Sequence, residues 1–262
     1  MTAHKLLPRV RNRIRRLVRL SGWDVVRYRP PSPPASSPLW PTLLGAANLP
    51  IRTVLDIGAK DGDTARIFRR YFPEAVIHCF EPHPQSFQSL ATWAATQVQS
   101  VYCYPFALGD RTGEAQLYTS GSRLAVASLL PPAPRRLADS DYMRALSTQP
   151  VELRRLDDVV ANLTLADELL VKIDTEGFDK QVILGGRTVL QRAAACIVEV
   201  HVWERYDSQP TFCELINMME ATGMRYAGTL HQCRKATGEV TYFDALFIRK
   251  RTDADCSKIS AA

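Results

Sequence analysis

Apolar and polar positions alternate along the chain in a pattern that predicts strands and helices in turn. Short apolar or β-branched runs of strand length are separated by runs with apolar residues at helical spacing. The predicted strands are Thr53–Ile57, Ala75–Glu81, Val98–Ala107, Glu114–Thr119, Leu169–Asp174, Cys196–Val202, Tyr226–Leu230 and Thr241–Arg249. The predicted helices are Thr64–Tyr71, Pro84–Ala95, Leu156–Ala161, Lys180–Gly185, Arg187–Gln191 and Thr211–Thr222.

This order of elements predicts an α/β fold. Repeated β-α-β units give a doubly wound, mostly parallel sheet that carries helices on both faces. The last two strands, with the turn-like Ala236–Glu239 between them, indicate an antiparallel hairpin at the sheet edge. The stretch Ser120–Gln149 is too irregular for a core element, and we expect it to shape the binding site of a substrate.

Composition divides the chain into four segments. We predict a basic amphipathic segment, a linker with six prolines in twelve residues, a catalytic-sized domain and a short tail. In order, these segments are Met1–Arg29, Pro30–Pro41, Thr42–Arg251 and Thr252–Ala262.

The net charge of +6 is concentrated in the first thirty residues, which hold nine Lys or Arg against Asp24 and so carry +8. The remainder is therefore slightly acidic, which argues against a nucleic-acid partner for the main domain. Within the basic segment, Pro8–Leu20 has an apolar helical face surrounded by arginines. It predicts either peripheral contact with an anionic membrane or a terminal helix that docks on the domain.

The six cysteines show no CxxC pair and no Cys/His cluster with zinc-ligand spacing. Cys79 and Cys103 lie in apolar runs and Cys196 precedes one, as expected of buried thiols in a reduced protein. No secretory segment or membrane-spanning apolar run is apparent. We therefore expect a cytoplasmic protein, with contact at the inner face of the membrane as a further prediction.

The most informative stretch is Asp56–Gly62, DIGAKDG, which joins a buried strand directly to a helix. Such a turn places free backbone N–H groups at the carboxyl end of the strand, where a nucleotide-like ligand can bind. Its spacing is not the GxGxxG of a pyrophosphate turn, and Asp56 would repel a pyrophosphate but attract a cationic sulfonium. The motif favours S-adenosylmethionine over NAD, although an ordinary βα turn would look similar.

An acid at the end of the next strand supports a nucleoside ligand. Glu81 precedes Pro82 and lies 25 residues after Asp56, where an acid accepts hydrogen bonds from ribose hydroxyls in doubly wound folds. The alternative is an exposed acid that caps the following helix.

Two later strands deliver further polar groups to the same sheet edge. Asp174 and Glu176 follow a buried strand in VKIDTEG, where they would bind a hard cation, act as a base or cap the next helix. Glu199 and His201 share one face of another strand in IVEVH. His201 would take a proton near neutral pH, or serve as a structural histidine.

These motifs, in this order, resemble the FkbM-type methyltransferase family. The segments that carry the resemblance are DIGAKDGDTA, FEPHP, ALGDRTGEAQLY, LRRLDDV, LVKIDTEGFDKQVILGG and IVEVH. Lys60 and Asp61 depart from the family, whose members commonly carry Asn and a small or apolar residue there.

The resemblance implies a class I methyltransferase fold and O-methylation of a sugar hydroxyl in a glycolipid, polysaccharide or natural product. It assigns the cofactor loop to Asp56, Gly58, Ala59 and Gly62, the ribose contact to Glu81, and a second signature to Asp174, Glu176 and Gly177. We also expect Pro82, next to Glu81, to line the cofactor site. We expect His201, Asp174, Glu176 or Glu199 to deprotonate the acceptor or to hold Mg²⁺, with Asp174, Glu176 and Glu199 as the ligands if a metal is present.

Two other functions share parts of this pattern. An NAD(P)-dependent oxidoreductase would share the fold and Glu81 but needs the glycine-rich turn that the chain lacks. A non-catalytic cofactor-binding module held at a membrane surface would also retain the cofactor motifs.

Overall fold

The computed structural model describes Ala46 and residues 49–98, 100–120, 127–134, 146–166 and 168–250. The predictions for Pro8–Leu20, the proline-rich linker and the tail after Arg251 lie outside these residues. Among the described residues, no helix combines the length and apolar character needed to cross a membrane.

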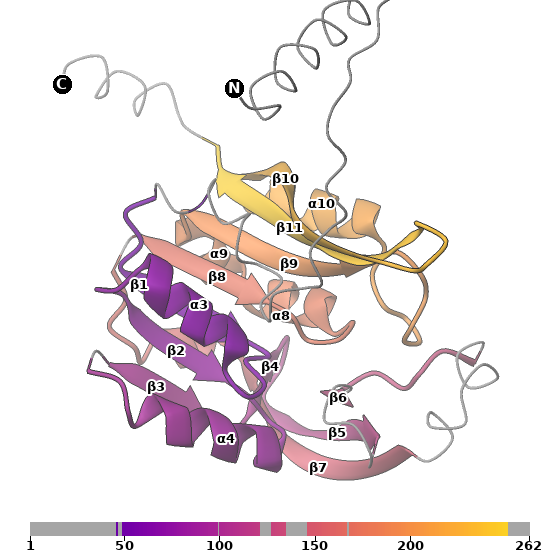
Figure 1. Ribbon diagram of the computed structural model, residues 1–262, viewed down its shortest axis with the longest axis horizontal. Helices are drawn as coiled ribbons and strands as arrows, with labels where there is room; N and C mark the ends of the chain where they lie inside the picture. Colours follow the sequence, from indigo (N-terminus) through magenta and orange to yellow (C-terminus); the bar gives the residue numbers. More distant parts are fainter. Residues whose placement is uncertain are drawn as a thin grey trace, which may run out of the picture. The chain divides into compact units, whose positions relative to one another are not determined.

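A seven-stranded sheet forms the centre of the described domain (Figure 1), with strand order β10-β11-β9-β8-β1-β2-β3. All neighbouring strands from β3 to β9 are parallel, whereas β11 is antiparallel to both β9 and β10. The predicted α/β class and the antiparallel edge hairpin are therefore confirmed. The bounds are β1 Thr53–Ile57, β2 Val76–Phe80, β3 Val101–Tyr104, β8 Leu169–Ile173, β9 Ala195–His201, β10 Met224–Arg234 and β11 Val240–Arg249.

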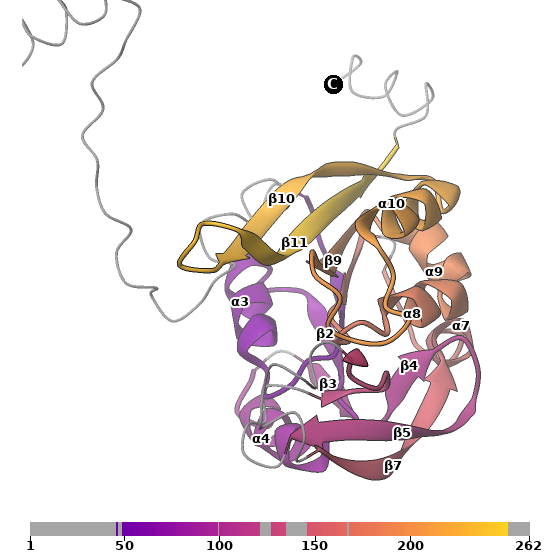
Figure 2. The same ribbon diagram turned by 90° about the vertical axis from the view of Figure 1, so that its right-hand side faces the viewer.

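Helices cover both faces of this sheet (Figure 2) and produce two separate apolar cores. The helices α3 and α4 pack on one face, and α7 to α10 pack on the other. Every residue of β1 and β8 is buried, as expected for central parallel strands that are covered on both sides. The bounds are α3 Asp63–Tyr71, α4 Pro84–Ala94, α7 Leu156–Val160, α8 Asp179–Gly185, α9 Arg187–Arg192 and α10 Phe212–Ala221.

The strand register aligns the carboxyl ends of three strands. Ile57, the last residue of β1, pairs with Phe80 of β2 on one side and with Ile173 of β8 on the other. The residues that follow these strands therefore emerge at one edge of the sheet. This alignment brings the glycine loop, Glu81 and Asp174 next to one another.

A second, four-stranded sheet was not predicted. Its strand order is β4-β7-β5-β6, and only β5 matches a predicted strand of its own. The predicted strand Val98–Ala107 was wrong in extent, because the chain leaves the large sheet after Tyr104 and enters the small sheet at Ala107. The bounds are β4 Ala107–Gly109, β5 Gly113–Ser120, β6 Ala127–Ser128 and β7 Leu146–Arg155.

The prediction of an irregular Ser120–Gln149 was also wrong at its end, because β7 begins at Leu146. This strand contains Pro150, and its clear alternation of buried and exposed residues begins only at Val151. Its first half is held by pairing with β5 over Ser120–Gln116, a partner that sequence periodicity does not reveal.

Candidate active site

The glycine loop after β1 is shaped by close contact with the end of β8. Gly58 has a left-handed backbone, and a Cβ there would lie 1.9 Å from the carbonyl oxygen of Asp174. The Asp174 amide in turn donates to the carbonyl of Ile57 at 3.0 Å. Only glycine fits at position 58, because the two strand ends touch through their backbones.

The loop's first amides are not free for a ligand, which corrects the sequence-based expectation. The N–H groups of Gly58 and Ala59 both donate to the carbonyl of Phe80, at 3.0 and 3.1 Å. The N–H of Lys60 donates to Glu81 Oε2 at 2.8 Å. These amides anchor the loop to the end of β2, so the loop presents a fixed wall to the site.

Glu81 is held in a single orientation by backbone donors. Besides Lys60, the N–H of His83 donates to its Oε1 at 2.7 Å. Burial raises the pKa of Glu81 to about 7, against the lowering effect of these hydrogen bonds. The carboxylate is buried and not the exposed helix cap of the alternative interpretation, although it does bond to the residue that precedes α4. Each oxygen keeps capacity for a further donor.

Asp56 lies beneath the loop and not on the surface of the site. Its carboxylate is fully buried, and neither oxygen has a hydrogen-bond partner among the described residues. Burial raises the pKa of Asp56 to about 6, partly opposed by the charge of Lys172, whose Nζ lies 4.0 Å away.

Lys172 is a buried cation that sequence analysis did not single out. It lies on β8 with 2% of its side chain exposed, and its Nζ donates to Asp174 Oδ2 at 2.7 Å. Burial lowers the pKa of Lys172, but the charges of Asp174, Asp56 and Asp244 outweigh this effect and raise it overall. A charged residue within the apolar VKI run was the signal available in the sequence. The ion pair engages Asp174, one of the predicted catalytic residues, at the floor of the site.

The turn after β8 directs Glu176 back toward the sheet edge. Glu176 and Gly177 both have left-handed backbones, and a Cβ on Gly177 would contact the Tyr206 ring at 2.9 Å. The alternative prediction, that Asp174 or Glu176 caps the next helix, is wrong, because α8 has no side-chain capping bond. Instead Asp179 accepts from the amide and hydroxyl of Thr175, at 3.1 and 2.9 Å.

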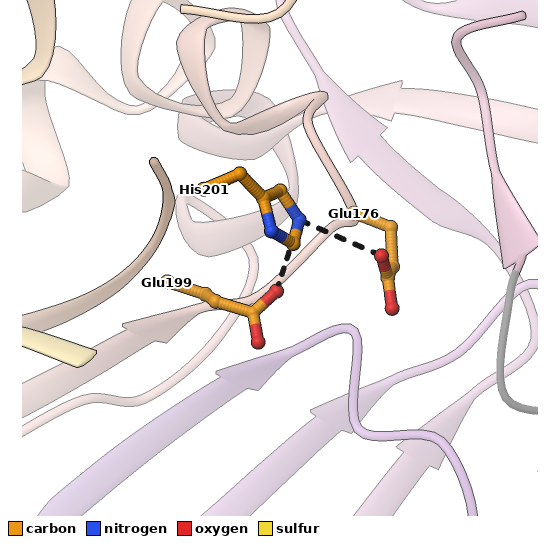
Figure 3. Close-up of side chains that lie close together, drawn as sticks. All are labelled: Glu176, Glu199 and His201. Carbon is orange, nitrogen blue, oxygen red and sulfur yellow. Dashed lines mark ion pairs between the residues drawn. The ribbon is translucent and has the colours of Figure 1, made fainter. Parts of the chain in front are cut away.

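Glu176, Glu199 and His201 converge into one cluster (Figure 3), hereafter the Glu-Glu-His cluster. His201 Nε2 lies 3.2 Å from Glu199 Oε2 and 3.5 Å from Glu176 Oε2. Glu199 and His201 are two residues apart on β9, so their side chains lie on the same face of the strand, as predicted. Asp174, which we also expected to be a metal ligand, is paired with Lys172 and is not among the three.

The two glutamates of the cluster have opposite electrostatic environments. Burial raises the pKa of Glu176, but His201, the Arg205 charge and a 2.6 Å hydrogen bond from the Tyr206 hydroxyl outweigh it and lower that pKa to about 2. For Glu199, burial and the neighbouring carboxylates Asp174, Glu176 and Asp244 raise the pKa well above its usual value. Two adjacent acids whose pKa values are shifted in opposite directions are typical of active sites.

The strand β6 and the residues that follow it, up to Ala133, pack against the turn that carries Glu176 and against the loop after β9. Ser128 Oγ donates to the carbonyl of Glu176 at 2.7 Å, and the amide of Ala133 donates to the carbonyl of Arg205 at 3.0 Å. Pro132 and Tyr206 form a β-bridge. Sequence analysis missed Ser128, Arg205 and Tyr206, because their roles come from contacts between segments far apart in the chain.

Comparison with known families agrees with this geometry. The model of the methyltransferase FkbM domain matches residues 56–226, which include the glycine loop, Glu81 and the whole cluster. The chain belongs to the FkbM methyltransferase family. This membership confirms the resemblance and favours a methyltransferase over the NAD(P)-dependent oxidoreductase.

A relative found by sequence comparison carries the name of a methyltransferase. The chain is 25% identical over 175 residues to "2-O-methyltransferase NoeI" of Sinorhizobium fredii (strain NBRC 101917 / NGR234), over 65% of this chain and 72% of the relative.

Solved methyltransferases are similar at low identity. Precorrin-6y C5,15-methyltransferase of Geobacter metallireducens aligns with a TM-score of 0.43 and 11% identity, over 79% of this chain and 85% of its own. The 1,6-didemethyltoxoflavin-N1-methyltransferase of Burkholderia thailandensis, solved with S-adenosylhomocysteine, aligns with a TM-score of 0.42 and 12% identity. The alignment covers 80% of this chain and 76% of that enzyme. Scores below 0.5 give no ground for transferring a ligand or a reaction.

The buried ion pair predicts a large effect on stability. Lys172→Met should lower the free energy of unfolding by about 3–5 kcal/mol, because it leaves Asp174 and Asp56 without their buried counter-charge. Urea unfolding at pH 7.5 measures this change. Lys180→Met is the control, since Lys180 is exposed and its 3.6 Å contact with Glu214 is worth about 1 kcal/mol or less.

Combining Lys172→Met with Asp174→Asn should recover part of the lost stability, since the double variant no longer leaves the Asp174 carboxylate unpaired. The recovery should be incomplete, because Asp56 stays buried without its counter-charge. Equal stability of Lys172→Met and Lys180→Met would contradict the assigned role.

Proposed function

We propose that the protein transfers the methyl group of S-adenosylmethionine to a hydroxyl of a sugar or sugar-containing molecule. The observation that carries this proposal is the meeting of two different sets of groups at one sheet edge. A glycine loop and a buried acid suited to a nucleoside follow β1 and β2, and the Glu-Glu-His cluster comes from the turn after β8 and the end of β9. The crevice at the carboxyl ends of parallel strands is where open α/β sheets bind their ligands.

The donor side fits S-adenosylmethionine. Glu81 is fixed by the amides of Lys60 and His83 and retains lone pairs for two ribose hydroxyls. Asp174 lies beside the loop and Asp56 beneath it, and the two carboxylates exceed the single charge of Lys172, which favours a sulfonium or ammonium group. The loop's bonded amides offer no cradle for a pyrophosphate, which agrees with the absence of GxGxxG.

For methyl transfer, the protein has to align the acceptor oxygen with the methyl carbon and to remove the proton of the acceptor hydroxyl. As the acceptor oxygen attacks the methyl carbon, the C–O bond forms and the S–C bond breaks, so that the sulfonium becomes the neutral sulfide of S-adenosylhomocysteine. The acceptor hydroxyl loses its proton to the Glu-Glu-His cluster. Because the sulfonium is already activated, holding the two reactants in line supplies most of the acceleration.

The acceptor is supported by two arguments of different weight. The similarity to a 2-O-methyltransferase supports an oxygen acceptor, and the family resemblance implies a sugar hydroxyl. The small sheet carries a candidate space for an acceptor, a groove of about 270 Å³ lined by Tyr118, Leu129 and Phe178 together with polar residues. Leu129 follows Ser128, which bonds to the Glu176 carbonyl, so the groove and the cluster are connected through this segment.

A first prediction concerns the donor. Glu81→Ala should weaken binding of S-adenosylhomocysteine by more than about tenfold, because hydrogen bonds to a charged acceptor are worth about 1.5–3 kcal/mol. Titration calorimetry at pH 8 measures the dissociation constant. Affinity of the natural protein should also fall as the pH drops through about 7, where Glu81 takes up a proton.

Asp63→Asn is the matched control for this loop, since its carboxylate is exposed and lies 3.1 Å from Arg66 on the same helix. The pH dependence should disappear in Glu81→Gln. Wild-type affinity in Glu81→Ala, or binding of NADH in place of S-adenosylhomocysteine, would contradict the assigned donor site.

The second prediction tests the reaction itself. Incubation with tritiated S-adenosylmethionine and a panel of oligosaccharides, glycolipids and glycosylated natural products should label a sugar. The label should resist alkaline hydrolysis, as a methyl ether does and a methyl ester does not. Glu199→Gln should lower transfer by about 10² or more while S-adenosylhomocysteine still binds, since a positioned acid–base group contributes about that factor.

Glu152→Gln, an exposed acid paired with Arg154, should leave transfer unchanged. Donor binding without transfer to any acceptor of the panel would instead favour the non-catalytic module. Cytoplasmic location and membrane contact through Pro8–Leu20 stay predictions, as does the dependence on Mg²⁺.

A further inference from the structure

We propose that Glu176, Glu199 and His201 bind one divalent cation through a carboxylate oxygen of each glutamate and the Nε2 of the histidine. These three side chains come from the turn after β8 and from the end of β9. Their ligand atoms all lie within 4.8 Å of one another.

The two distances from the histidine to the glutamates match ligands around a common ion. With metal–ligand bonds of about 2.1 Å, neighbouring ligand atoms lie about 3.0 Å apart in octahedral and about 3.4 Å apart in tetrahedral geometry. His201 Nε2 is 3.2 Å from the Glu199 oxygen and 3.5 Å from the Glu176 oxygen. The imidazole nitrogen is thus adjacent to both carboxylates at distances that a shared ion would produce.

Two of the ligand atoms lack any other partner. His201 Nε2 and Glu199 Oε2 are buried and make no hydrogen bond of acceptable alignment within the described part of the chain. Only 3% of the His201 side chain is exposed. A buried polar atom without a partner is costly, and here Nε2 points between two carboxylate oxygens. A cation in that position would satisfy the nitrogen and both oxygens at once.

The surrounding charge favours a cation. Described carboxylates outnumber described Lys and Arg groups around the cluster, and the excess has to be balanced by bound cations or protons. The carboxylates are Asp56, Asp174, Glu176, Glu199 and Asp244, and the cations are Lys172 and Arg205.

The contact between Arg205 and His201 determines which nitrogen of the imidazole ring carries the proton before a cation binds. Its Nη1 donates to His201 Nδ1 at 3.4 Å, which places the ring proton on Nε2 in the cation-free state. A cation on Nε2 requires the proton to move to Nδ1, and the Arg205 contact must then open. Arg205 therefore competes with the cation, and removing its charge should tighten cation binding.

The ligand set also indicates the kind of ion. One imidazole nitrogen with two carboxylates suits Mn²⁺ or another first-row divalent cation better than Mg²⁺, which prefers oxygen ligands and retains its waters. The hydrogen bond from Tyr206 to Glu176 would orient that ligand from outside the coordination sphere. With three protein ligands, the ion would keep open positions of the kind found in catalytic centres.

The role of the ion rests on the proposed function. An acceptor hydroxyl bound at an open position would have its pKa lowered by the ion, and its proton would pass to a carboxylate oxygen of the cluster that does not bind the ion. In this arrangement His201 is a ligand and not the base.

The experiment measures Mn²⁺ binding to the full chain after chelator treatment, without donor or acceptor present. Electron paramagnetic resonance should detect one tightly bound equivalent, with a ¹⁴N coupling from the histidine. Glu199→Gln and His201→Asn should each weaken binding by more than about tenfold, and His201→Asn should abolish the ¹⁴N signal. Arg205→Gln should tighten binding at least about threefold, and Mg²⁺ should displace Mn²⁺ only in more than about tenfold excess.

Glu152→Gln serves as the control acid outside the cluster and should bind as the natural protein does. Absence of bound Mn²⁺ above nonspecific levels, binding without ¹⁴N coupling, or unchanged affinity in Glu199→Gln or Arg205→Gln would overturn the assignment. If His201→Asn fails to fold, the ¹⁴N signal of the natural protein and the isosteric Glu199→Gln still decide. Because no donor is used, this result is separate from the outcome of the methyl-transfer assay.

Discussion

The candidate site depends on one buried ammonium group. Lys172 places a positive charge at the floor of the sheet edge, 2.7 Å from Asp174 and 4.0 Å from Asp56. Without such a charge, several acids could not be removed from water so close together, since each buried carboxylate costs several kcal/mol unless it is neutralised. Lys172 thereby allows one strand end to carry the negative charge that both a sulfonium donor and a cation require.

Backbone contacts set the geometry above this charge. The approach of Gly58 to the Asp174 carbonyl joins β1 to β8, and the loop amides join β1 to β2. The proposed donor side is therefore made from rigid strand ends. The proposed acceptor side is held differently, by Ser128, Pro132 and Tyr206, which pack segments from the small sheet and the β9–α10 loop against the Glu176 turn.

The strands that are buried on both faces, and the residues at their carboxyl ends, could be predicted from the sequence. The strands β1 and β8 appear as mostly apolar runs, each with one charged residue, Asp56 or Lys172, and the predicted bounds of β1 agree with the structure. The convergence of Glu199 and His201 follows from their spacing of two residues on one strand. The carboxyl-edge position of Glu81 follows from the order of strands in a doubly wound sheet.

The parts that sequence analysis missed depend on partners distant in the chain. The first half of β7 lacks alternation because β5 supplies its hydrogen bonds, and β3 and β4 appear as one run because the apolar pattern continues where the chain changes sheets. Asp174 and Glu176 look equivalent in DTEG. The left-handed backbone at Glu176 sends one acid to the cluster, while Lys172 retains the other.

The most direct test is a crystal structure with S-adenosylhomocysteine bound. The ribose hydroxyls should donate to Glu81, and the sulfur should face the cluster of Glu176, Glu199 and His201 across the crevice. A ribose held elsewhere, or a sulfur directed away from the cluster, would show that donor and acceptor chemistry do not meet at this sheet edge.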